Sequence, residues 1–209
     1  MKKKPFWDVE EDTGFIKIKS PLDNLDYKVY NTGSPDEQLQ VAIMLSKVRR
    51  DLNKLLIYLC KNPQLWINDS IGYGIIHTFD IHIPCLHNHF EQVLNNESII
   101  LKDTNLYPIQ EMTPNKHGIL GLNKPKKIKT IKLANGKDYE IAEKRSMHLT
   151  IRTNGKIHDY SKILLLAIHE ITHTTCNDIY WKEDNHKYPY GKYHTQMKNW
   201  AKDCGIIKN

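Results

Sequence analysis

The sequence predicts an α+β fold, and three patterns along the chain support that prediction. Apolar residues at helical spacing follow Ser34 and predict a long amphipathic helix. Apolar stretches on both sides of Asn135-Gly136 predict a β-hairpin, because this dipeptide suits a tight turn with positive φ angles. A leucine-rich stretch from Lys162 to Ile168 predicts a second helix. We therefore expect a small sheet with helices packed on it.

The long helix has clear start signals. Ser34 precedes Pro35 and Glu37, which is the order of a capping serine, a first-turn proline and a glutamate that bonds back to the cap. Its apolar spacing continues to about Lys61. At 209 residues the chain fits one domain, so we expect an N-terminal arm over 1–33 and one domain over 34–209.

The hairpin is expected over Ile128–Ile141, and a further strand over Ser146–Arg152. In that strand apolar and polar residues alternate, which predicts one buried and one exposed face. As a half-buried edge strand before the leucine-rich helix, it could hold an extended peptide by adding it as another strand. A C-terminal helix is expected over Tyr193–Cys204, with Gly205 as its stop.

Residues 71–90 contain four histidines and Cys85, but their spacing fits no tetrahedral metal site, and we expect histidines there that are hydrogen-bonded within the fold or face the solvent. Pro84 argues against a helix through this stretch.

Composition narrows the function classes. A formal charge of +6 and a pI near 9.0 permit contact with nucleic acid. Only four of the 30 basic residues are arginine, so a solvated lysine surface is the simpler interpretation. No apolar run approaches the roughly 20 residues of a membrane-spanning helix. The four cysteines form no CxxC pair and no signal peptide precedes them, so we expect reduced thiols and an intracellular location.

The motif with the clearest chemistry is His169-Glu170-Ile171-Thr172-His173, an HExxH sequence. Residues four apart share a helix face, so His169 and His173 can bind one Zn²⁺ while Glu170 lies beside an open coordination position. This arrangement predicts amide hydrolysis by a zinc-bound water, with Glu170 as the general base.

A catalytic zinc needs a third protein ligand, and the only histidines after His173 are His186 and His194. We favour His194, because Met197 and Trp200 would dock its helix on the core and fix the direction of the ring. His186 lies in a polar segment without such an anchor. The weaker candidates are Cys176, Asp178, Glu183 and Asp184. A donor for the oxyanion is also expected, and the candidates are Tyr188, Tyr190, Tyr193 and His186.

These residues resemble a known family. The matching stretches are Gly121-Leu122-Asn123, Leu149-Thr150-Ile151-Arg152, Tyr160, Ile163 and Ile168 to His173, which look like the WLM domain. The end of the chain is similar to SprT and Spartan-type peptidases in its Tyr193-His194, Met197, Trp200 and Gly205.

The resemblance implies a minimal zincin-like metallopeptidase fold, with a small sheet, an HExxH active-site helix and packed helices. It assigns the zinc ligands to His169, His173 and His194 and the general base to Glu170. It also implies protein or peptide substrates and an association with DNA, since the eukaryotic members cleave DNA-protein crosslinks. Two alternatives remain open: a structural module stabilised by zinc, and a nucleic-acid-binding protein whose metal centre is incidental.

Overall fold

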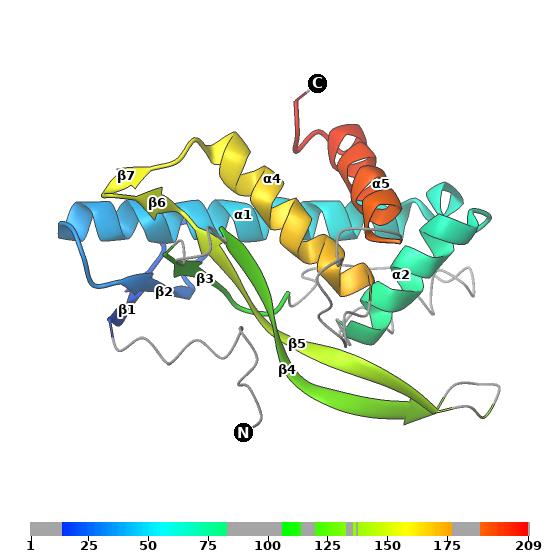
Figure 1. Ribbon diagram of the computed structural model, residues 1–209. Helices are drawn as coiled ribbons and strands as arrows, with labels where there is room; N and C mark the ends of the chain where they lie inside the picture. The colour runs from blue at the N-terminus through cyan, green and yellow to red at the C-terminus, as the bar shows by residue number, and fades with distance from the viewer. Residues whose placement is uncertain are drawn as a thin grey trace.

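Helix α1 (Pro35–Lys61) runs along the molecule, and most of the other elements pack on it (Figure 1). The computed structural model describes residues 14–82, 106–113, 120–132, 136, 138–176 and 189–208. Helices and small sheets are both present, so the predicted α+β class is confirmed.

The start of α1 follows the predicted capping pattern. The Glu37 main-chain N–H donates to Ser34 Oγ at 3.2 Å, and the Ser34 main-chain N–H donates to Glu37 Oε2 at 2.7 Å. Pro35 occupies the first turn, where its missing N–H removes no helical bond. Because α1 ends at Lys61, where its apolar spacing was expected to stop, the predicted helix is confirmed at both ends.

The central sheet has three strands in the order β3-β5-β4. Strand β5 (Asp138–Thr150) lies in the middle, pairing in parallel with β3 (Ile109–Met112) and antiparallel with β4 (Gly121–Lys132). Gly136, with a φ angle of 77°, lies in the turn between β4 and β5, so the predicted hairpin is confirmed. The two long strands continue past β3 as a ribbon that leaves the helices (Figure 1).

The prediction that Ser146–Arg152 forms a half-buried edge strand is wrong. These residues span the end of β5 and the start of β6 (Arg152–Thr153), and β5 has a neighbour on each side. Its apolar Met147 and its polar Thr150 are both buried. Alternation identifies a strand, but the strand's position in the sheet depends on pairing with distant segments.

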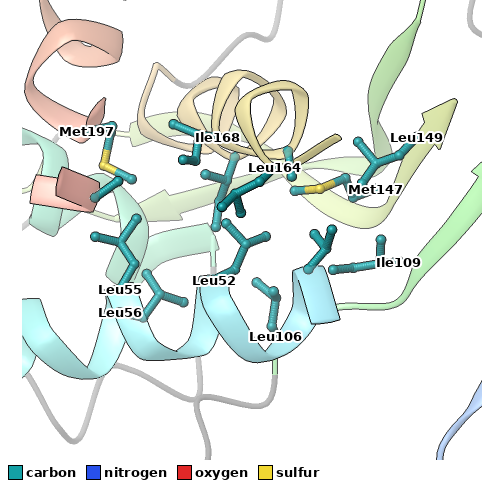
Figure 2. Close-up of a cluster of buried hydrophobic side chains, with 14 of the residues drawn as sticks. Leu52, Leu55, Leu56, Leu106, Ile109, Met147, Leu149, Leu164, Ile168 and Met197 are labelled. Atoms are coloured by element: carbon teal, nitrogen blue, oxygen red, sulfur yellow. The ribbon is translucent and has the colours of Figure 1, made fainter. Parts of the chain in front are cut away.

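The hydrophobic core lies between α1, the sheet and the two C-terminal helices, α4 (Tyr160–Thr172) and α5 (Tyr190–Asp203) (Figure 2). Leucines of α1 meet residues of the strands and of both helices there. The side chains labelled in the figure are Leu52, Leu55, Leu56, Leu106, Ile109, Met147, Leu149, Leu164, Ile168 and Met197.

Helix α2 (Ser70–His82) follows the short 3-10 helix Pro63–Leu65 and occupies the first part of the histidine-rich stretch, before Pro84. Residues 83–90 lie outside the described residues, so the expectation that no helix runs through the whole stretch stays a prediction. His77 of α2 is exposed, as expected for that stretch. The side chains of the other three histidines and of Cys85 are not among those that the structure describes.

At the opposite end of α1, β1 (Phe15–Lys19) and β2 (Asp26–Tyr30) form an antiparallel hairpin. Tyr27 and Val29 of β2 join the core. A second small hairpin pairs β6 with β7 (Lys156–Ile157) and leads into α4. Among the described residues, no helix is both long and apolar enough to cross a bilayer.

Candidate metal centre

The HExxH motif lies at the C-terminal end of α4. His169 and Glu170 are in its last turn, and His173 opens a short 3-10 helix, His173–Thr175. Apolar residues on one face of α4 anchor it in the core: Ile163, Leu164, Ala167, Ile168 and Ile171. The two histidines, one turn apart, are therefore presented by a helix with little freedom to rotate.

The structure brings His194 to this pair. The ring centres of His169 and His173 lie 5.2 Å apart, and those of His169 and His194 lie 5.5 Å apart. His194 comes from α5, which docks through the buried side chains of Met197 and Trp200. The helix was predicted to begin at Tyr193 and begins at Tyr190, so His194 lies in its second turn.

The ring spacing tests whether these histidines suit zinc. Three imidazoles on one tetrahedral zinc have ring centres roughly 5 Å apart, given Zn–N bonds of about 2 Å. The observed spacings agree with this. The rings meet edge to face, and within the described residues no group of three His, Cys, Asp or Glu side chains is arranged, as it stands, to hold a metal ion. Rotation about the Cβ–Cγ bond re-aims a ring nitrogen without moving the ring far, so these ring positions are compatible with a shared zinc.

Tyr190 packs against all three imidazoles. Its ring centre lies 5.2 Å from that of His169, 4.6 Å from that of His173 and 5.5 Å from that of His194. Its hydroxyl donates to the main-chain carbonyl of His169 at 3.0 Å. Tyr190 thereby joins the start of α5 to the last turn of α4, one helical turn before His194.

Of the expected oxyanion donors, Tyr190 donates its hydroxyl proton to the His169 main-chain carbonyl of α4. The Tyr193 hydroxyl lies beside α2, where a Cβ on Gly74 would approach it to 3.4 Å. Tyr188 and His186 lie outside the described residues.

Glu170 is buried, with 4% of its surface exposed, and it lies against the beginning of β4. A Cβ on Gly121 would come within 2.8 Å of both Cγ and Cδ of Glu170. Two residues further along, the Asn123 side chain donates from Nδ2 to the Glu170 carbonyl at 2.8 Å. From the sequence these two residues contributed only to the resemblance, and no role was predicted for them. A glycine and an asparagine at the start of a strand were the available signal.

Asn123 belongs to a small polar cluster under the end of α4. Its Nδ2 also lies 2.9 Å from Thr174 Oγ1 and 3.0 Å from the Tyr107 hydroxyl, and those two hydroxyls are 2.9 Å apart. Burial raises the pKa of the Tyr107 hydroxyl, and the nearby Glu170 charge adds to that rise. Tyr107 therefore stays protonated at neutral pH and can act as a hydrogen-bond donor.

The weaker ligand candidates contribute less to this picture. Cys176, which follows the 3-10 helix, is half-buried, and its Sγ lies 3.6 Å from Thr175 Oγ1. The segment that carries Asp178, Glu183 and Asp184 lies outside the described residues, as does His186.

Comparisons with protein-family models, curated proteins and solved structures gave no match to this chain.

Proposed function

We propose that the chain is a zinc-dependent metallopeptidase with a minimal zincin-like fold. His169, His173 and His194 hold the metal in this proposal, and Glu170 is the general base. One observation supports it most directly: α5 brings a third imidazole to within 5.5 Å, between ring centres, of an HExxH histidine. Imidazole is a preferred zinc ligand, and three protein ligands leave a fourth position for water or substrate.

A bound zinc would lower the pKa of its water towards about 7 and polarise the scissile carbonyl. Glu170 then accepts the proton of the attacking water and delivers it to the leaving amine. The burial of this carboxylate favours a catalytic over a purely structural site, because burying a carboxylate is unfavourable without compensating interactions. A structural zinc site would have no use for a carboxylate between its two ligands.

The substrate class rests on the resemblance to WLM and SprT-like peptidases, which points to proteins or peptides. DNA is the second proposed partner. The net charge of +6 supports it, as do the five lysines in the sequence of β4, which has no acidic residue. DNA binding that weakens steeply as salt increases would support this partner, and an absence of binding at low salt would exclude it.

The decisive experiment compares zinc content and peptidase activity in a tag-free chain and three variants. Wild type should hold one zinc per chain. Glu170→Gln should keep the zinc and lose activity by a factor of about 10² or more, because the general base is gone. His194→Ala should lose most of the zinc. His77→Ala, at an exposed histidine of α2, is the matched control and should resemble wild type in both measurements.

Wild type without zinc after reconstitution would overturn the metal centre. Full activity in Glu170→Gln would overturn the mechanism. Undiminished zinc in His194→Ala would reject the third ligand, and attention would turn to His186.

A further inference from the structure

Two residues at the beginning of β4 contact different parts of Glu170. Gly121 and Asn123 are two apart in a strand, so they lie on the same face of the sheet, and that face meets the last turn of α4. Gly121 lies against the carboxylate end of Glu170, and Asn123 binds its main-chain carbonyl.

The Gly121 contact leaves no room for a side chain. An added Cβ would lie 2.8 Å from Glu170 Cγ and Cδ, and it would also clash with Oε1. Such distances are far inside van der Waals contact, so even alanine would displace the carboxylate. The strand backbone therefore forms one wall of the space that the carboxylate occupies.

The Asn123 contact fixes the peptide at Glu170. The carbonyl there accepts from the His173 main-chain N–H, where the helix tightens, and also from Asn123 Nδ2. A carbonyl can only accept, so the amide group of Asn123 must direct its nitrogen to α4. This orientation ties the strand to the residue that bears the carboxylate.

That orientation leaves the other end of the amide without a bond. Asn123 is fully buried, and its Oδ1 has no hydrogen-bond partner among the described residues. A buried, unsatisfied polar atom destabilises a fold by about 1–3 kcal/mol. An asparagine is thus a poor choice at this position for stability alone, and its contacts with α4 offer a better reason.

We infer that Gly121 and Asn123 are positioning residues for Glu170: the first β4 residues hold its carboxylate and its peptide group in the orientation needed for proton transfer. This inference rests on the proposed function. The contacts that carry it run from Gly121 to the Glu170 side chain and from Asn123 to the Glu170 carbonyl, Thr174 and Tyr107.

The test measures kcat, KM and zinc content for Asn123→Ala and Gly121→Ala, each in the wild-type and in the Glu170→Gln background. In wild type each change should lower kcat about 10-fold, because small displacements of a catalytic group have large effects on rate. KM and the single zinc should be unchanged. In Glu170→Gln the same changes should lower the residual kcat no further, since residues that act through one group are not additive.

Gly72→Ala is the matched control for the glycine change. A Cβ there would meet Cα and Cβ of Trp66 at 2.8 Å, as close as the Gly121 Cβ would come to Cγ and Cδ of Glu170, at a place remote from Glu170 in the chain. It should lower the melting temperature and leave kcat of the folded protein unchanged. Asn199→Ala, at an exposed asparagine of α5, is the control for Asn123→Ala.

The outcomes separate the inference from the proposed function. Wild-type activity in Glu170→Gln would overturn the proposed function. An inactive Glu170→Gln with full kcat in Asn123→Ala and Gly121→Ala would overturn only the positioning role. An equal fall in kcat in both backgrounds would also overturn it, since this indicates general damage to the fold. If Asn123→Ala does not fold, the test rests on Gly121→Ala, by comparing its effect on kcat in the wild-type background with its effect in the Glu170→Gln background.

Discussion

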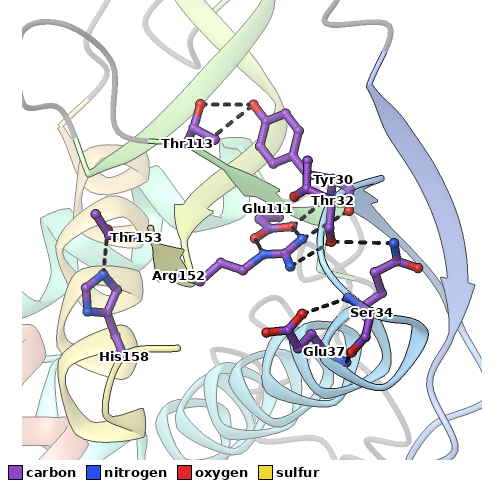
Figure 3. A network of polar contacts seen from close by, with 10 residues as sticks. Tyr30, Thr32, Ser34, Glu37, Glu111, Thr113, Arg152, Thr153 and His158 are labelled. Atoms are coloured by element: carbon purple, nitrogen blue, oxygen red, sulfur yellow. Dashed lines mark hydrogen bonds and ion pairs between the residues drawn. The ribbon is translucent and has the colours of Figure 1, made fainter. Parts of the chain in front are cut away.

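The molecule buries two clusters of polar side chains, and they differ in how completely their hydrogen bonds are made. One cluster surrounds Arg152 and Glu111, near the β1–β2 end of α1 (Figure 3). The other lies under the end of α4, around Asn123 and Glu170. Among the described residues, the first cluster makes all its hydrogen bonds, whereas the second contains an unsatisfied atom and borders the buried His173 and the half-buried His169 and His194.

In the first cluster the guanidinium and the carboxylate are matched bond for bond. Arg152 Nε donates to Glu111 Oε1 at 2.8 Å, and its two terminal nitrogens donate to the carbonyls of Thr32 at 2.9 Å and Tyr30 at 3.0 Å. The Tyr30 main-chain N–H donates to Glu111 Oε2 at 2.8 Å. These bonds join β3 and β6 to the end of β2, so the cluster serves the fold.

The cluster at α4 combines a buried carboxylate, three imidazoles and an amide oxygen that has no hydrogen-bond partner in the described part of the chain. Polar groups placed in this way are unfavourable for stability unless a ligand or a reaction uses them. The contrast teaches that polar burial alone is no reason to propose a functional site, whereas an unsatisfied polar atom beside ligand-type residues is one.

The largest effect on stability is expected from Arg152→Ala. It leaves Glu111 buried without its cation and should lower the free energy of unfolding by about 3–5 kcal/mol. Urea denaturation measures this. Arg50→Ala is the control, because the Arg50 side chain is 66% exposed beside Asp51 and should contribute less than about 1 kcal/mol. An equal fall in the free energy of unfolding in the two variants would contradict the view that the bonds of the Arg152–Glu111 cluster stabilise the fold.

Unlike Arg152→Ala, His169→Ala is expected to have little effect on stability without metal and to abolish the stabilisation by zinc. In metal-free protein it should change the free energy of unfolding by about 1 kcal/mol or less, because the ring is only half-buried. Zinc at 100 times its dissociation constant should stabilise wild type by about 2.7 kcal/mol and leave this variant unaffected. Calorimetry with and without zinc makes the comparison. Equal stabilisation of both proteins would place the metal elsewhere.

A smaller effect is expected from Tyr190→Phe, which keeps the ring among the imidazoles and removes the hydroxyl bond to the His169 carbonyl. The loss of about 1 kcal/mol should weaken zinc affinity roughly five-fold, provided that the bond aligns α5 with α4. Competition with a chromophoric chelator measures the affinity. Tyr73→Phe, at an exposed tyrosine of α2, is the control. Unchanged affinity would mean that side-chain packing alone positions His194.

The smallest effect concerns the other end of α4, where Tyr160 donates to Asp51 Oδ2 at 2.7 Å. Burial, the bond to Asp51 and the Asp51 charge raise the pKa of Tyr160 above its usual value of 10.0. Above pH 10 the unfolded chain loses this proton while the folded chain keeps it, so stability should fall as pH rises. Tyr160→Phe should reduce that fall, as measured by urea denaturation at pH 9 and pH 11. An identical slope in both proteins would contradict this.

The sequence predicted those elements whose signals are local. The capping residues of α1, the Asn135-Gly136 turn and the Gly205 stop each act within a few residues, and the structure has α1, the β4–β5 hairpin and α5 at these places. The error concerns a longer range. Alternation predicted a strand over Ser146–Arg152 but gave no information on the partners of β5.

The same division between local and long-range signals applies at the candidate site. His169, Glu170 and His173 are recognisable in the sequence because a four-residue spacing places both imidazoles on one helix face. Preference for His194 came from the apolar residues that would dock its helix, and its nearness to His169 depends on the packing of α5 against α4. The support for Glu170 was not predicted, since Asn123 is 47 residues away from it in sequence. A contact of that range forms only when the strand and the helix meet across the core, and no local pattern encodes it.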